Sequence, residues 1–319
     1  MSRPPALLRH AGHRAGNPLA GLLLLAIFTG CGSGNATRNG ATAGDKTADG
    51  EVDGKSVQVV EDIVEASDPL IPKPRPGSYL ESLSGTTVSF EMVPVPAGMM
   101  PDSTGTPTIR TPGFWISSTE VPWDVYDVYV FGLDGTAGPA AADAVAKPSK
   151  PYVLPGDAFG HAGLPALGMT ARAADHFVEW LSAKTGHPYR ILTEAEWEYA
   201  CGLATGSDVI NGEIVDAEAL SAIAWHAGNG DNRTHAVGEK VGGLGIHDLL
   251  GNASEWVHGR DGRPVVKGGS YRDEPSTVTC EARRLQTKAW NMTDPQLPKS
   301  PWWLSDGPFV ALRIARDME

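Results

Sequence analysis

Three cysteines are the residues of this 319-residue chain suited to thiol chemistry: Cys31, Cys201 and Cys280. A thiolate can bind a soft metal, attack an electrophile or form a disulfide, so the setting of each cysteine decides its chemistry. Cys31 ends an N-terminal stretch that carries three arginines and then an apolar run over residues 19–28. This order is typical of a secretory signal, and the run is about half of the roughly 20 residues that a membrane-spanning helix needs.

The four residues Phe28-Thr-Gly-Cys31 resemble the lipobox of bacterial lipoproteins, although the first position of that motif is more often leucine. The resemblance implies that residues 1–30 are a lipoprotein signal peptide and that Cys31 becomes the lipidated N-terminus. We therefore expect an exported lipoprotein that is anchored in a lipid bilayer through Cys31 and faces the periplasm or the cell surface. The alternative is an ordinary signal peptide that is cut nearby, with Cys31 incidental.

The charge of the chain excludes one class of partner. Removal of residues 1–30 takes away three arginines and no acidic residue, so 26 basic residues become 23 against 38 acidic ones, a net charge of −15. Such a surface repels the phosphates of nucleic acid. We expect no nucleic-acid partner.

The other two cysteines, Cys201 and Cys280, form an isolated pair, which outside the cytoplasm favours a disulfide.

The amino-acid composition of the chain changes once ahead of these cysteines. Residues 31–87 are rich in Gly, Ala, Thr, Asp and Lys and bury too little apolar surface to fold, so they predict a disordered tether. From Val88 the pattern is that of one globular domain, which we assign to residues 88–316, with a tail at 317–319.

Periodicity predicts the first elements of this domain. Val88–Pro94 alternates apolar and polar residues, as a strand does, and Gly113–Ile116 has the composition of a second strand. A helix is expected over Pro122–Phe131. Short apolar runs separated by Gly-rich loops follow towards the C-terminus, so the sequence indicates an α+β domain with much loop.

Capping residues predict two further helices. Thr170 can cap a helix whose apolar residues follow the i, i+3, i+4, i+7 pattern and which Gly186 ends. Thr193 and Glu196 then form a T-x-x-E capping box. The helix that begins there carries Cys201.

Six blocks of the domain, in order, resemble the formylglycine-generating-enzyme (sulfatase-modifying factor) superfamily. The blocks cover residues 90–98, 118–121, 180–200, 245–256, 267–271 and 309–316. Departures are mild: Leu192 stands where the family usually has Pro, and Ala311 where it usually has Gly. The resemblance implies the family's variant of the C-type-lectin-like fold, an α+β fold low in regular secondary structure.

The resemblance also implies what the reaction of the family would need. In its enzymes, two cysteines after a Gly-Gly-Ser motif bind copper(I), capture a substrate cysteine and convert it with oxygen to formylglycine. A soft, monovalent metal needs thiolate ligands. In this chain the first position falls on Asp273 and the second near Val278, so copper is not expected.

Cys280 resembles the family's structural cysteine, whose partner follows the Trp-Glu-Tyr helix and is here Cys201. The resemblance therefore implies one disulfide, which closes a loop of about 80 residues and contributes on the order of 4 kcal/mol in the chain-entropy model. A redox or copper-binding role for this pair is the alternative.

The resemblance implies a calcium cofactor as well. Two carboxylates and two backbone carbonyls form a calcium site of the family, and the corresponding residues are Asp248, Gly251, Ala253 and Glu255. Oxygen ligands on an irregular loop suit calcium. The alternative is a solvated turn in which Glu255 bonds to nearby backbone amides.

Two groups of residues are candidates for ligand binding. Ser270, Asp273 and Arg283 are candidates for a groove, because the serine of Gly-Gly-Ser lines the active-site groove in the family; a hydrogen-bonded turn serine is the alternative. A binding platform for a peptide or a sugar is the second candidate, since flat exposed rings stack on ligands, and core packing is its alternative. The platform residues are Trp302, Trp303 and Asp306.

Two functions follow from these observations. The first is a non-oxidase: a membrane-anchored extracytoplasmic protein whose domain is a binding or accessory module for a peptide, a glycan or a protein partner. The second is an enzyme, either a formylglycine-generating oxidase or a related metal-dependent oxidase that uses Asp273 or a histidine. The missing cysteines favour the first.

Overall fold

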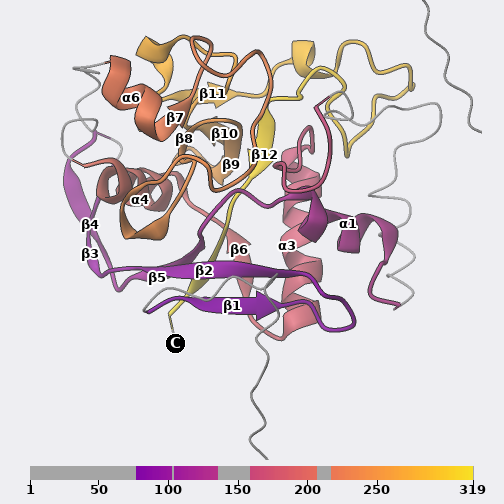
Figure 1. The fold of residues 1–319 in the computed structure, drawn as a ribbon, viewed down its shortest axis with the longest axis horizontal. Coiled ribbons are helices and arrows are strands. Elements are labelled where there is room, and N and C mark those ends of the chain that lie inside the picture. The colour runs from indigo at the N-terminus through magenta and orange to yellow at the C-terminus, as the bar shows by residue number, and fades with distance from the viewer. Residues whose placement is uncertain (1–76, 103, 136–158, 207–216, 319) are drawn as a thin grey trace, which may run out of the picture. The chain divides into compact units, whose positions relative to one another are not determined.

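The central sheet is built from strands of both ends of the domain. The computed structural model describes residues 77–102, 104–135, 159–206 and 217–318. Five strands pair antiparallel in the order β1-β2-β5-β13-β6. Their bounds are β1 Tyr79–Ser82, β2 Ser89–Val95, β5 Phe114–Ser117, β6 Tyr189–Ile191 and β13 Ile314–Asp317. The last strand of the chain therefore lies inside the sheet, between β5 and β6 (Figure 1).

A second, four-stranded sheet has the order β11-β10-β9-β12, and β12 is parallel to β9. Its strands are β9 Ser254–His258, β10 Pro264–Lys267, β11 Arg283–Leu285 and β12 Val310–Leu312. Two strand pairs complete the sheets: β3 Gly98–Pro101 with β4 Pro107–Thr111, and β7 Ala224–Trp225 with β8 Leu250–Gly251. The short strands confirm an α+β fold low in regular structure.

The two helices with predicted capping residues, Thr170 and Thr193, begin directly after them. The helices are α1 Trp123–Phe131, α3 Ala171–Thr185, α4 Glu194–Thr205 and α6 Ala217–Ile223, with short 3-10 turns η1 Gly243–Gly245, η2 Pro275–Thr277 and η3 Lys288–Asn291. The Thr170 hydroxyl accepts the Ala173 N–H at 3.2 Å, and Gly186 ends α3 with a φ of 76°. At α4 both bonds of the capping box form between Thr193 and Glu196. The three helices predicted from sequence are confirmed.

The ordered domain begins earlier than predicted. Tyr79–Ser82, which we assigned to the tether, forms β1 and pairs with β2, and Leu83 is fully buried. The polar composition around these residues does not indicate a strand. The short edge strand forms because pairing with β2 provides burial that its own residues do not provide alone. Residues 1–30, Cys31 and most of the tether lie outside the described residues.

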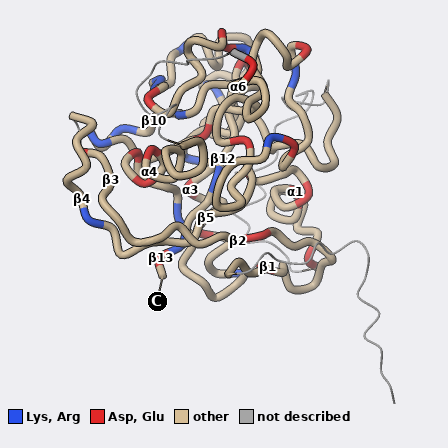
Figure 2. Tube along the Cα trace, turned by 60° about the vertical axis from the view of Figure 1, so that its left-hand side comes forward, with Lys and Arg blue, Asp and Glu red and all other residues tan. Residues whose placement is uncertain are grey.

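The predicted disulfide joins α4 to the segment before β11. Cys201 and Cys280 are bonded, with an S–S distance of 2.00 Å and 79 positions between them in sequence. They pack in one apolar cluster with Trp197 of α4 and with Val257 and Val265 of the second sheet. Figure 2 shows acidic residues of α4 close to this sheet. The disulfide thus fixes α4 against the strands that carry the candidate site.

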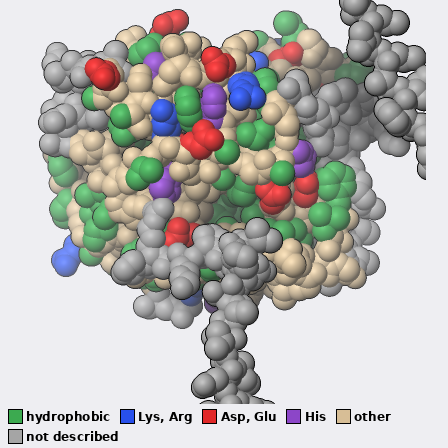
Figure 3. Space-filling model, in the orientation of Figure 1, with side chains coloured by type: hydrophobic (Ala, Val, Ile, Leu, Met, Phe, Trp, Pro, Cys, Tyr) green, Lys and Arg blue, Asp and Glu red, His purple; other side chains and the backbone are tan. Residues whose placement is uncertain are grey.

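No helix within the described ranges is long and apolar enough to cross a bilayer. On the face drawn in Figure 3, hydrophobic, acidic, basic and histidine side chains are interspersed.

Candidate binding groove and buried charge network

A groove of about 470 Å³ lies between the end of β10 and β11. It is lined by Gly269, Asp273, Thr277, Thr279, Glu281, Ala282, Arg283 and Arg284. Two of the three predicted groove residues, Asp273 and Arg283, line it. Ser270 is fully buried, and it contacts the groove through Asp273.

The carboxylate of Asp273 is already engaged. Arg284 binds both of its oxygens, with Nη1–Oδ1 at 3.0 Å and Nη2–Oδ2 at 2.7 Å, and the Ser270 hydroxyl donates to Oδ2 at 2.8 Å. Arg284 Nη2 also donates to Ser254 Oγ at 3.0 Å. A bidentate pair holds both planar groups in one orientation. Asp273 is therefore a fixed wall of the groove. The sequence analysis missed Arg284; its position beside Arg283 was the available signal.

Neither position that would need a thiolate supplies one. Asp273 is paired with Arg284, and Val278 is fully buried against Gly269, where an added Cβ would lie 3.0 Å from Val278 Cγ2. The disulfide uses Cys201 and Cys280. Within the described ranges no thiol is left for copper(I), and no three His, Cys, Asp or Glu side chains gather as a metal site. These residues do not fit copper.

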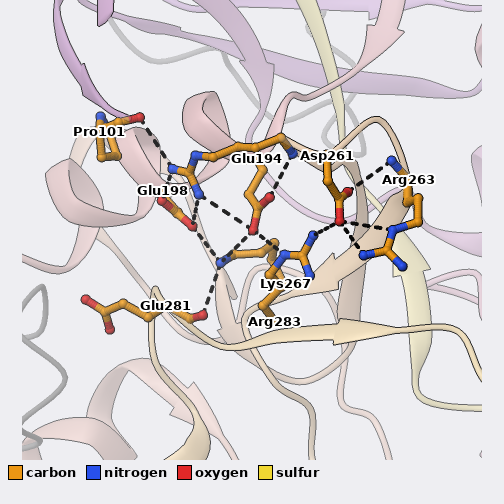
Figure 4. Close-up of polar contacts among 9 residues, drawn as sticks. Pro101, Glu194, Glu198, Asp261, Arg263, Lys267, Glu281 and Arg283 are labelled. Atoms are coloured by element: carbon orange, nitrogen blue, oxygen red, sulfur yellow. Dashed lines mark hydrogen bonds and ion pairs between the residues drawn. The ribbon is translucent and has the colours of Figure 1, made fainter. Parts of the chain in front are cut away.

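Behind the groove, a buried ion network ties α4 to β10 (Figure 4). The fully buried ammonium of Lys267 donates to Glu198 Oε1 at 2.8 Å and to the Glu281 carbonyl at 3.2 Å. Glu194 Oε1 lies 3.8 Å from the same nitrogen, and Arg260 binds Glu198. The two glutamates are four positions apart on α4, so they share one face of the helix.

Arg283 belongs to this network. Its Nε donates to Glu194 Oε1 at 2.9 Å and its Nη2 to Asp261 Oδ2 at 3.1 Å. Figure 4 shows Arg283 between these two acids, with Arg263 on the far side of Asp261. These ion pairs hold Arg283 in the wall of the groove, where it was expected from the sequence.

Burial and pairing oppose each other in the network. Burial raises the pKa of Glu198, but hydrogen bonds from Arg260 and the charge of Lys267 outweigh it, and the pKa lies below its ordinary value. Burial lowers the pKa of Lys267, and the charge of Glu198 offsets part of that effect. Removing one partner would leave a buried charge unpaired, which costs more than the intact pair contributes.

The residues expected to bind calcium are Asp248, Gly251, Ala253 and Glu255. The two carboxylates among them interact with a buried arginine, Arg313. Arg313 Nε donates to both oxygens of Glu255 at 2.9 and 3.0 Å, and Trp197 Nε1 donates to one of them at 2.7 Å. Both oxygens of Asp248 accept backbone N–H groups of the preceding loop. Calcium takes about six to eight oxygen ligands. Here the guanidinium already neutralises the negative charge of Glu255 that a calcium ion would otherwise neutralise. These side chains do not fit calcium in this arrangement.

A third carboxylate, Glu120, completes the buried cluster. It is fully buried; Oε1 accepts from Asn252 Nδ2 at 2.9 Å, and Oε2 has no hydrogen-bond partner among the residues that the structure describes. Burial and then the charge of Asp248 raise the pKa of Glu120 well above its ordinary value. Burial also raises the pKa of Asp248 to about 6. The fully buried guanidinium of Arg313 therefore lies among three carboxyl groups, those of Glu120, Asp248 and Glu255.

The geometry can be set beside known proteins. A family model described as the sulfatase-modifying factor enzyme 1-like domain matches residues 84–294, more than half of the chain. The chain belongs to this family. A comparison with curated proteins gives no match.

Three solved structures are similar to this sulfatase-modifying factor domain. Treponema denticola variable protein 1 is 16% identical with a TM-score of 0.54, over 76% of this chain and 100% of its own. PvdO from Pseudomonas aeruginosa is 22% identical with a TM-score of 0.49, over 78% and 100%, and CarF is 17% identical with a TM-score of 0.48, over 72% and 99%. At these identities the first likeness supports the fold alone.

The predicted platform of this sulfatase-modifying factor domain is not assembled. Trp303 is 1% exposed and packs in the core beside Trp123, so the core alternative is correct for Trp303. Trp302 is half-buried, with the guanidinium of Arg172 4.5 Å from its ring centroid. Asp306 accepts hydrogen bonds from the backbone and hydroxyl of the neighbouring Thr293 at 2.7 and 2.8 Å. One face of Trp302 is thus already covered.

Glu120→Gln is expected to change how stability depends on pH. The pKa of Glu120 is higher in the folded state than in the unfolded chain, so the folded state binds this proton more tightly. Its contribution is fully present below the ordinary pKa of 4.5 and is lost as the pH rises. The variant should therefore be more stable than the wild type at pH 8, by about 1–3 kcal/mol, and closer to it at pH 4.5. Urea unfolding at both pH values measures this, and equal differences at both would contradict it.

Proposed function

We propose that this chain is an exported, lipid-anchored member of the sulfatase-modifying factor family whose groove binds a peptide, a glycan or a protein partner without oxidising it. One observation carries the proposal: the position of the first copper ligand is Asp273, locked to Arg284 by two hydrogen bonds. A carboxylate in a bidentate pair is a hard, occupied ligand, and copper(I) prefers thiolates. The wall of the groove at this position is thus a paired carboxylate and carries no sulfur.

A copper(I) titration tests the absence of the oxidase centre. The purified chain is titrated anaerobically with a copper(I) complex while the ultraviolet thiolate-to-copper charge-transfer band is followed. No stoichiometric band is expected. A Cys201→Ala/Cys280→Ala variant is the matched control, because it removes the two disulfide cysteines that could bind copper after accidental reduction. A stoichiometric band in the oxidised wild-type chain would favour the oxidase instead.

In this proposal, the lipid anchor holds the protein at a membrane, on the side away from the cytoplasm. The arginines, the apolar run and the small residues before Cys31 support it. In a bacterial host, the mass of the N-terminal peptide should show a diacylated Cys31, and Cys31→Ser should release the protein from the membrane fraction. A Cys31→Ser protein that stays membrane-bound would refute the anchor.

Calcium can be tested through the stability of the domain. Because Arg313 neutralises Glu255, we expect the melting temperature to change by no more than about 1–2 °C between EGTA and millimolar calcium. The matched control repeats the comparison with magnesium. A calcium-specific rise of several degrees would show that the family's calcium site forms here after all, with Arg313 displaced.

A further inference from the structure

We infer that the domain carries a second binding site, for an acidic saccharide, in the pocket beside η3. The inference deepens the proposed binding function and rests on it. The pocket measures about 620 Å³ and follows directly after β11 along the chain, beyond the groove. It is lined by residues 286–288, 291–292 and 299–300.

The charge of the pocket favours an anion. Lys288 and Lys299 line it, and none of its lining residues is acidic. Among the described residues, the Lys288 ammonium makes no hydrogen bond or ion pair. The nearest acid in the loop, Asp294, is 2% exposed, and its oxygens accept the N–H groups of Gln296 and Ser300 at 2.9 and 2.6 Å. This protein is acidic as a whole, so an ammonium group without a partner marks one place on it that attracts an oxyanion.

One wall of the pocket is held rigidly. Asn291 Oδ1 accepts the Ser305 N–H at 3.0 Å, and its Nδ2 donates to the Ser300 carbonyl at 3.3 Å. Lys299 Nζ donates to the Met292 carbonyl at 2.9 Å, which positions its ammonium. Trp290 anchors η3 in the core. A positioned charge loses less freedom when a ligand binds.

The other wall offers groups that suit hydroxyls and a sugar ring. The side chains of Gln286 and Thr287 line the pocket, and within the described part of the chain neither makes a hydrogen bond. Met292 is 70% exposed and supplies an apolar surface for the C–H face of a ring. The ammonium groups suit a carboxylate, the amide and hydroxyl groups suit sugar hydroxyls, and the thioether suits the face of a sugar ring. A uronic-acid sugar has all three features, whereas a neutral sugar lacks the carboxylate and a simple acid lacks the ring.

The test titrates the full chain with D-glucuronate, D-glucose and acetate, followed by calorimetry and saturation-transfer NMR. We expect glucuronate to bind at millimolar concentration, and glucose and acetate about tenfold more weakly or not at all. Lys288→Gln should weaken glucuronate binding about threefold to tenfold without altering thermal unfolding, because the Lys288 side chain makes no hydrogen bond or ion pair with the described part of the chain. Lys299→Gln should act in the same direction. Arg110→Gln, which removes an exposed charge on β4 outside the pocket, should have no effect.

Several results would overturn the inference. Equal binding of glucose and glucuronate, or full glucuronate binding by the Lys288→Gln and Lys299→Gln variants, would refute the anionic site. Tighter binding of a triglutamate peptide at the same lysines would assign the pocket to an acidic peptide instead. A chain that binds neither glucuronate nor copper(I) refutes this site alone, whereas copper(I) uptake refutes the proposed function independently of glucuronate.

Discussion

Replacement of Cys201 and Cys280 together by alanine is expected to lower the free energy of unfolding by about 4 kcal/mol. The disulfide spans 79 positions and restricts the unfolded chain over that length. Both cysteines are buried in the apolar cluster around Trp197, so the lost sulfur atoms also leave space that the cluster fills only in part. Urea unfolding of the variant and the wild type measures the difference.

Two controls separate the disulfide from other thiol effects. Cys31→Ala removes the third cysteine and should leave the free energy of unfolding unchanged, because residue 31 lies in the predicted tether. The wild type under a strong reductant should approach the Cys201→Ala/Cys280→Ala variant. A loss below about 1 kcal/mol in both would show that the bridge does not restrain the unfolded chain as expected.

Arg313→Met is expected to destabilise the domain by about 3–5 kcal/mol at neutral pH. Arg313 is fully buried, and it also donates to the carbonyls of Ser117 and His247 at 2.9 and 2.7 Å. Methionine fills part of the volume but leaves Glu255 and its acidic neighbours without a cation. Chemical unfolding at pH 7 measures the loss.

The matched control is Arg263→Met, which breaks a pair whose arginine side chain is 63% exposed. Exposed pairs contribute about 0–1 kcal/mol, so this variant should unfold almost like the wild type. Adding Glu255→Gln to Arg313→Met should recover part of the loss, since it removes one uncompensated charge. Equal effects of Arg313→Met and Arg263→Met would show that the buried cluster is not electrostatically important.

Elements with local signals could be predicted from the sequence. Thr170 and Gly186 bound α3, and the Thr193 capping box begins α4, because side chains within four residues satisfy the free backbone groups at helix ends. The disulfide between Cys201 and Cys280 followed from the cysteine count and the family resemblance. Each of these inferences needed only neighbours in sequence or a recognised motif.

The buried polar contacts of Glu255 and Glu120 could not be predicted from the sequence, because the partners are far apart in the chain and meet only in the tertiary fold. Glu255 and Arg313 are 58 residues apart, and Asn252 meets Glu120 across 132 residues. The same limit applies to Trp303, whose burial depends on residues far away in the chain, such as Trp123. Sequence reasoning found the groove residue Asp273 but not the arginine that holds it.

Two contacts shape the groove around Asp273. The fold needs Gly269 close against Val278, and it needs the Asp273 backbone, whose carbonyl accepts the Ala227 N–H at 2.9 Å. Neither requirement involves sulfur. Under the proposed binding function, the groove keeps these two contacts, and Arg284 holds its wall at Asp273.

The most direct measurement is the mass of a Cys-x-Pro-x-Arg peptide after incubation with the purified chain, copper(I) and oxygen, with a hydrazide reagent present to trap any aldehyde. A binding module predicts an unchanged peptide mass and no trapped adduct. Catalytic conversion of the peptide cysteine to formylglycine would contradict the account, because it would require a reaction centre that Asp273 and Val278 do not provide.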